Sequence, residues 1–91
     1  MDDLPVTIDE IRTAIDETDA ILLKALAARF RAIRALKKLK KHEGVPLEDL
    51  NREAQLKALW KQQARELGVP ESLALLMLDF ILAESKRTQE S

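Results

Sequence analysis

Apolar residues recur with a helical period along the first half of the chain. Every seventh position on one face reads Ile8, Ile15, Leu22, Arg29 and Leu36. Thr7, with Glu10 three residues later, forms a capping-box pattern that marks a helix start. No glycine or proline follows until Gly44. The pattern therefore predicts a single helix of about 35 residues, roughly 50 Å long at the usual rise per residue.

Two shorter helices are predicted in the second half of the chain. Asp49 is a suitable N-cap for a helix that ends at Leu67, because Gly68 fits the left-handed position that closes helices. Pro70 fits the first turn of a third helix, which extends to about Gln89. Its first half is apolar nearly all round, which is typical of a helix buried on most sides. The predicted fold is all-α, with three helices in a single domain spanning residues 1–91.

The length of the first helix indicates a second chain. A compact domain of 91 residues has a radius of gyration of about 12 Å, which a helix of roughly 50 Å overshoots. Its outer half would expose the apolar stripe unless another surface covered it. A break near residue 20 is the alternative, but residues 16–20 contain no glycine or proline. We therefore expect a homodimer whose long helices pair across a two-fold axis.

Composition and charge exclude several classes of protein. The net charge of −1 gives no overall attraction to nucleic acid or to an acidic membrane. The absence of cysteine excludes disulfides and thiolate metal sites, and His42 alone cannot build a metal site. The acidic N-terminus lacks the apolar segment of a signal peptide, and the longest apolar run is too short to span a bilayer. We expect a cytoplasmic protein without a metal.

Cations on the apolar stripe are candidates for chemistry. Arg29 interrupts an aliphatic row, and Lys40 continues the neighbouring row eleven residues later. Both lie on one face, about 16 Å apart, so their long side chains can converge on an anion. The alternative for a lone arginine is a side chain that snorkels at the edge of a bundle. Arg12 lies roughly 25 Å before Arg29 along the helix and reaches the same site only from a second chain. The alternative interpretation of Arg12, a solvated surface arginine, is equally good.

Further candidates lie near the ends of the other two predicted helices. Asp49 is expected to act as a cap, whereas Arg52 in a first turn opposes the helix dipole and indicates an anionic or polar partner. Glu53 is placed to accept a hydrogen bond from a hydroxyl. Ser85 and Gln89, four residues apart, extend the buried row of the third helix. The alternative for this pair is a frayed polar C-terminus.

The candidate set suits an electrostatic site rather than a covalent one. It offers cations, one carboxylate, and amide and hydroxyl donors, which can bind a dianion and stabilise developing charge. The sequence has no glycine-rich phosphate loop, no Ser–His–Asp set and no cysteine nucleophile. The other cations of residues 31–41 are interpreted as a solvated face, because nucleic-acid binding would call for interleaved aromatic residues.

The order of these residues resembles that of the all-helical, AroQ-type chorismate mutases. The matching series is Arg12, Arg29, Lys40, Asp49, Arg52, Glu53, Ser85 and Gln89. It spans nearly the whole chain, and Asn51 departs from it by standing where an acidic residue is common. The resemblance implies an intertwined homodimer that converts chorismate to prephenate, in phenylalanine and tyrosine biosynthesis, without a cofactor.

The resemblance also implies catalytic roles in binding the substrate and stabilising the transition state. Arg29 and the partner subunit's Arg12 would bind the two carboxylates of the substrate. Lys40 and Gln89 would hydrogen-bond the ether oxygen, where negative charge grows as the C–O bond breaks.

The remaining residues are assigned to the ring hydroxyl by the same resemblance. Glu53 would accept its hydrogen bond, helped by the backbone of Asp49. Arg52 and Ser85 would complete the polar wall near that hydroxyl and a carboxylate.

Two rival functions stay open at this point. An isochorismate–pyruvate lyase shares the fold and much of the cationic site, although the turn containing Asp49, Arg52 and Glu53 favours the mutase. A non-catalytic helical interaction module would not need Arg29, Lys40 or Gln89 at all.

Overall fold

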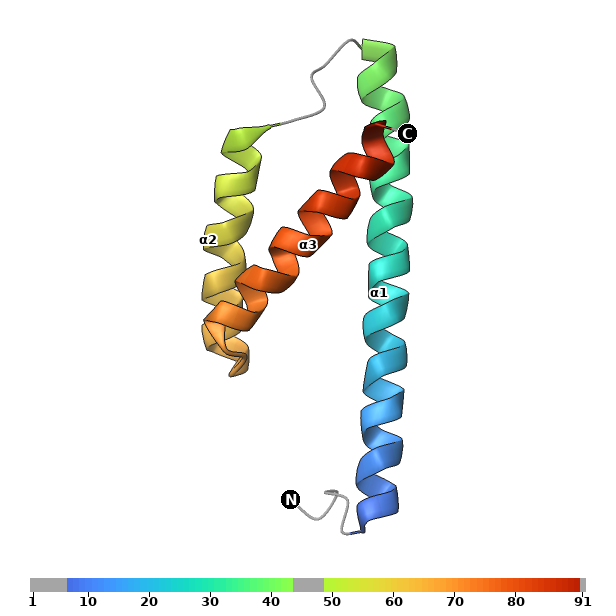
Figure 1. Ribbon diagram of the computed structural model, residues 1–91, viewed down its shortest axis with the longest axis vertical. Coiled ribbons are helices and arrows are strands. Elements are labelled where there is room, and N and C mark those ends of the chain that lie inside the picture. The colour runs from blue at the N-terminus through green and yellow to red at the C-terminus, as the bar shows by residue number, and fades with distance from the viewer. Residues whose placement is uncertain (1–6, 44–48, 91) are drawn as a thin grey trace. The chain divides into compact units, whose positions relative to one another are not determined.

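The structure, a computed structural model, describes residues 7–43 and 49–90, without the side chains of residues 43, 89 and 90. It contains three helices, α1 (Ile8–Glu43), α2 (Leu50–Leu67) and α3 (Glu71–Glu90) (Figure 1). No strand occurs in the described ranges, so the predicted all-α fold is confirmed. The contacts divide the chain into two units, Met1–Ala32 and Ile33–Ser91.

α1 is one unbroken helix of 36 residues, as predicted. The backbone N–H of Glu10 donates to Oγ1 of Thr7 at 3.1 Å, which confirms Thr7 as the N-cap. Thr18 lies on a mostly apolar row, and its hydroxyl donates to the carbonyl of Ala14 at 2.8 Å. This local bond satisfies the hydroxyl without a partner from another element. Gly44, the expected breaker, lies outside the described residues.

Both ends of α2 form as their capping residues predict. Oδ1 of Asp49 accepts the backbone N–H of Arg52 at 3.1 Å. Gly68 has a left-handed φ of 73°, where a glycine avoids the strain that a Cβ would cause. Its N–H donates to the carbonyl of Arg65 at 3.4 Å, and the next N–H, of Val69, donates to Ala64 at 2.8 Å. These bonds satisfy carbonyls that the end of the helix leaves without a partner.

The predicted start of α3 differs from the observed one by a single residue. The helix begins at Glu71, and Pro70 is its capping residue rather than part of its first turn. The carbonyl of Pro70 accepts the N–H of Ala74 at 3.1 Å, the first bond of the helix. A proline suits this position because it has no N–H to leave unsatisfied.

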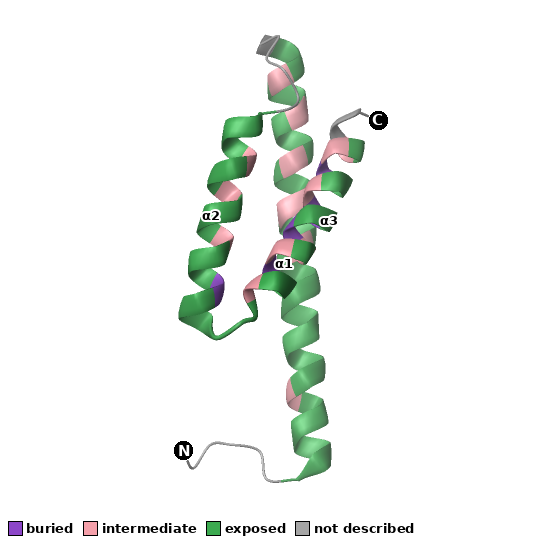
Figure 2. Cartoon of the chain, turned by 60° about the vertical axis from the view of Figure 1, so that its left-hand side comes forward, coloured by how far each residue is buried: buried purple, intermediate pink, exposed green. Residues whose placement is uncertain are grey.

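α2 and α3 pack together as a hairpin with a small core. Leu78 is fully buried, and the other buried residues of the described chain are Ala64, Ala74, Ile81 and Ser85 (Figure 2). The remaining sides of α3 are open, and Phe80 is 74% exposed. The expectation that the first half of α3 is buried on most sides is therefore wrong for the single chain. Contact with one helix covers only one stripe of another.

None of the helices described here is both long and apolar enough to cross a membrane.

Candidate functional site

Two of the predicted site residues share one face of α1. Arg29 and Lys40 are both partly buried, although each is a long cation. Since they are eleven residues apart on one helix, their backbones lie about 16 Å apart along its axis. Arg12, by contrast, is exposed and lies seventeen residues before Arg29, or roughly 25 Å along the same axis.

The first turn of α2 carries the next three predicted residues. The Asp49 carboxylate caps the helix through the N–H of Arg52, so its expected structural role is confirmed. The Arg52 side chain is exposed. The Glu53 side chain is only 18% exposed, so most of this charged group is covered by protein. A covered carboxylate without a partner would be costly, which makes its contacts informative.

The last turns of α3 carry Ser85 and Gln89. Ser85 is 3% exposed, and its Oγ donates to the carbonyl of Ile81 at 2.7 Å. The prediction that Ser85 faces inward is therefore confirmed. The backbone of Gln89 lies within α3, but its side chain is outside the described part. The contact of Gln89 with the ether oxygen stays a prediction.

An ion pair connects these two regions. Nζ of Lys86 lies 3.0 Å from Oε1 of Glu53, so the first turn of α2 meets the last turns of α3. The structure thus brings Glu53 to the end of the hairpin that carries Ser85. Lys86 is not among the site residues predicted from the sequence. The only signal was its position next to Ser85, which does not reveal how α3 sits along α2.

A second ion pair stabilises the opposite end of the hairpin. Nε of Arg65 in α2 lies 3.0 Å from Oε2 of Glu71 in α3. This hydrogen bond, together with the attraction between the charges, raises the pKa of Arg65 above its usual value. The same hydrogen bond holds the pKa of Glu71 below its usual value.

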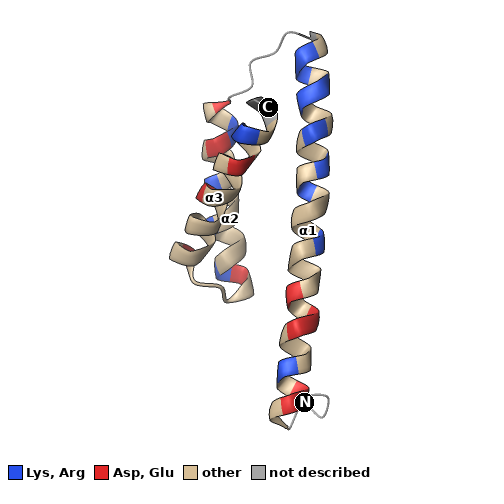
Figure 3. Ribbon diagram, turned by 45° about the vertical axis from the view of Figure 1, so that its right-hand side comes forward, with Lys and Arg blue, Asp and Glu red and all other residues tan. Residues whose placement is uncertain are grey.

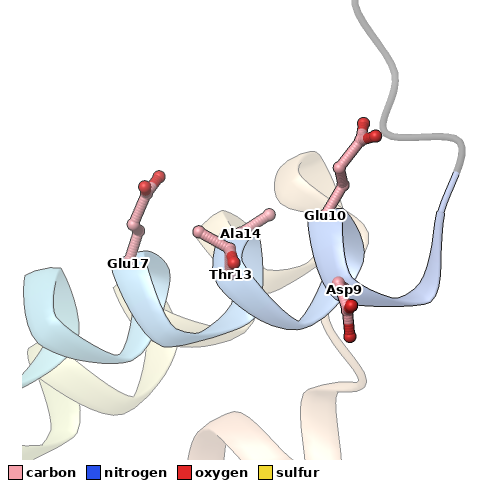
Figure 4. A pocket seen from close by; sticks show the side chains of 5 residues that line it. All are labelled: Asp9, Glu10, Thr13, Ala14 and Glu17. Atoms are coloured by element: carbon pink, nitrogen blue, oxygen red, sulfur yellow. The ribbon is translucent and has the colours of Figure 1, made fainter.

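A surface hollow on the N-terminal part of α1 offers different chemistry. It has a volume of about 360 Å³ and is lined by Asp9, Glu10, Thr13, Ala14 and Glu17. Glu10 and Glu17 extend their carboxylates to the same side, whereas Asp9 points the other way (Figure 4). This acidic lining repels a dianion, and none of the predicted site residues belongs to it. No group of three or more His, Asp or Glu side chains in the described ranges is arranged to hold a metal ion.

Comparison with known proteins decides between the classes of function that the geometry allows. Residues 11–90 match the family described as chorismate mutase type II. The chain belongs to this family. The predicted family and its activity, chorismate mutase, are thereby confirmed, whereas the roles of single residues and the homodimer stay predictions.

Two curated relatives of this chain differ greatly in length. A chorismate mutase of Methanocaldococcus jannaschii is 27% identical over 81 residues, which cover 89% of this chain and 82% of the relative. The T-protein of Enterobacter agglomerans is 33% identical over 75 residues, which cover 82% of this chain but only 20% of the T-protein. The chain thus spans about a fifth of the longer relative. No solved structure matches the chain significantly.

Proposed function

We propose that this chain rearranges chorismate to prephenate in a homodimer whose two sites each take residues from both subunits. The observation that carries the proposal is the pair of partly buried cations, Arg29 and Lys40, on the apolar face of α1 in a chain of this family. Two cations in register on one face of a helix can together bind a dianion. A substrate with two carboxylates is a ligand of this kind.

The reaction needs no nucleophile, base or redox group. One C–O bond breaks while one C–C bond forms, in a cyclic shift of electron pairs within a single molecule. The protein must hold the reactive conformer and favour the more polar transition state. Arg29 and Arg12 of the partner subunit clamp the two carboxylates. Lys40 and Gln89 donate to the ether oxygen as negative charge develops there.

The hydroxyl end of the substrate is assigned to the hairpin. Glu53 accepts a hydrogen bond from the ring hydroxyl, with the Asp49 backbone beside it. Arg52 and Ser85 line the same end. The burial of Ser85 and the partial burial of Glu53 support this assignment, because a desolvated polar group discriminates strongly for its partner.

The exposed apolar face of α1 supports the homodimer. Ile8 is 67% exposed, Ile15 is 53% exposed, and Leu22 on the same row is also exposed. The buried core of the described chain lies in the α2–α3 hairpin and is made largely of small residues. A chain of 91 residues with so little buried surface gains stability by covering this face with a second copy.

The charges on α1 favour an antiparallel arrangement of the two long helices. The N-terminal half is mainly acidic and the C-terminal half is cationic (Figure 3). The acidic residues are Asp9, Glu10, Asp16, Glu17 and Asp19. The cations of α1 from Lys24 onward are Lys24, Arg29, Arg31, Arg34, Lys37, Lys38, Lys40 and Lys41. Antiparallel pairing places unlike charges side by side, whereas parallel pairing would place like charges together. It also brings Arg12 of one chain toward Arg29 of the other.

The direct test follows chorismate consumption by ultraviolet absorbance on the purified protein. We expect conversion well above the uncatalysed rate, and a loss of about 10²–10³ in kcat for Lys40→Ala. Arg34→Ala is the matched control. Arg34 is exposed and lies about 140° around the helix from Arg29, so its loss should leave the rate unchanged. Wild-type conversion no faster than the uncatalysed reaction would refute the proposal.

Isochorismate offered in the same assay separates the mutase from the lyase. Release of pyruvate from isochorismate as the dominant activity would assign the site to the lyase reaction instead. Full activity after Arg29→Ala and Lys40→Ala would remove the cationic site from the mechanism.

A further inference from the structure

We infer that Lys86 is a positioning residue that sets how strictly the site recognises the substrate's ring hydroxyl. The inference rests on the proposed function, because it assigns Lys86 to the carboxylate that is proposed to bind this hydroxyl. Its structural basis is the 3.0 Å ion pair between Nζ of Lys86 and Oε1 of Glu53.

The two side chains of the Glu53–Lys86 pair differ in how far the protein covers them. The Glu53 side chain is 18% exposed and that of Lys86 is 42% exposed, so the carboxylate is the more enclosed partner. Lys86 follows Ser85, which is almost completely buried, in the helix that packs against α2. An ion pair between two packed helices is therefore fixed at both ends. Its ammonium group restricts the rotamers that the Glu53 side chain can adopt.

The ion pair leaves Glu53 able to accept a second hydrogen bond. An ionised carboxylate is an acceptor only, with two oxygens and about four lone-pair sites. Lys86 contacts Oε1, so the group keeps acceptor capacity for a hydroxyl. A fixed, charged acceptor selects a hydroxyl over a hydrogen atom at the same ring position.

The test measures a ratio on one protein sample. Chorismate is compared with an analogue in which hydrogen replaces the ring hydroxyl and the allyl vinyl ether remains. The ratio of kcat/KM for the two substrates reports recognition of the hydroxyl alone. Because both substrates meet the same enzyme, the ratio does not depend on how much of the protein is folded. This removes the ambiguity of a merely structural effect.

Four variants complete the design. Glu53→Gln should lower the ratio by about tenfold or more, since a charge-assisted hydrogen bond is lost. Lys86→Met should lower it by at least about threefold, and the double variant should lose less than the product of the two single effects. Lys86→Arg should restore the ratio to within about twofold of wild type, because it keeps the positive charge.

The matched control is Arg65→Met, at the opposite end of the same hairpin. Arg65 makes an ion pair of the same length with Glu71, far along α2 from Glu53. We expect this variant to lower the melting temperature without changing the ratio. If Lys86→Met yields no folded protein, Lys86→Gln replaces it and should show the same fall in the ratio.

The outcomes separate this inference from the proposed function. An active wild-type enzyme whose ratio is unchanged by Lys86→Met or Lys86→Gln overturns the role of Lys86 and leaves the mutase proposal standing. Additive effects of the Glu53 and Lys86 substitutions also overturn it, because the residues would then act independently. An inactive wild-type enzyme refutes the mutase itself. A reduced ratio, rescued by arginine and non-additive with Glu53→Gln, supports the inference.

Discussion

Mixing two inactive variants should restore activity if each site is built from two subunits. The variants are Arg12→Ala and Lys40→Ala, each inactive alone because every site lacks one cation. A mixed dimer contains one site that lacks both residues and one site that keeps both. When the two variants are unfolded together and refolded, activity should therefore reappear.

The expected size of the recovery follows from the length of α1. Arg12 and Arg29 belong to one unbroken helix and lie roughly 25 Å apart along it, several times the reach of an arginine side chain. Arg12 can then serve only the partner's site. Random pairing makes about half of the dimers mixed, and each mixed dimer has one intact site in two. About a quarter of the wild-type activity should return.

The assay is chorismate consumption at equal total protein, with each variant refolded alone as the blank. Wild-type protein refolded with the Arg34→Ala control should keep full activity, which checks that refolding itself does no harm. No recovery in a mixture that sedimentation shows to be dimeric would place Arg12 and Lys40 in the same subunit's site. A folded monomer in solution would remove the proposed role of Arg12.

Three further predictions concern stability. Leu78→Ala empties a fully buried position in the hairpin core and should cost about 2.7–5 kcal/mol in the free energy of unfolding, measured by urea titration. Gly68→Ala should cost about 1–2 kcal/mol by the same measurement, because φ is 73° and an added Cβ meets nothing within 4 Å, which leaves backbone strain as the only cost. The hydrogen bond with Arg65 is the chief cause of the lowered pKa of Glu71 in the folded state. The pair therefore stabilises the fold at pH values above the ordinary pKa of glutamate. This contribution to the free energy of unfolding is lost as the pH falls through the lowered pKa. Urea midpoints that fall equally with acid in wild type and Glu71→Gln would contradict this.

The helix ends could be predicted from the sequence because local chemistry determines them. Thr7 and Asp49 each cap a helix through a backbone N–H three residues later, as their side chains predict. Gly68 takes the left-handed conformation that its lack of a Cβ permits. The single misplaced boundary, at Pro70, differs by one residue, because a proline fits both the cap and the first turn.

The packing of α2 on α3 could not be predicted from periodicity. The pattern identified Ser85 as inward-facing, but it did not show which residue of α2 lies beside Lys86. The pattern also overestimated the burial of α3. An apolar helix face is compatible with a position in a core and equally with contact to a second surface. Phe80 is the clearest case, being apolar and yet exposed in the single chain.

The locality of the hairpin core has a consequence for how the protein folds. Its buried residues all lie between positions 64 and 85, on either side of the turn at Gly68. Closing so short a loop costs little entropy, so we expect the hairpin to form early and at a rate that does not depend on protein concentration. In the proposed homodimer a second copy covers the apolar face of α1, and we expect that encounter to become slower as the protein is diluted.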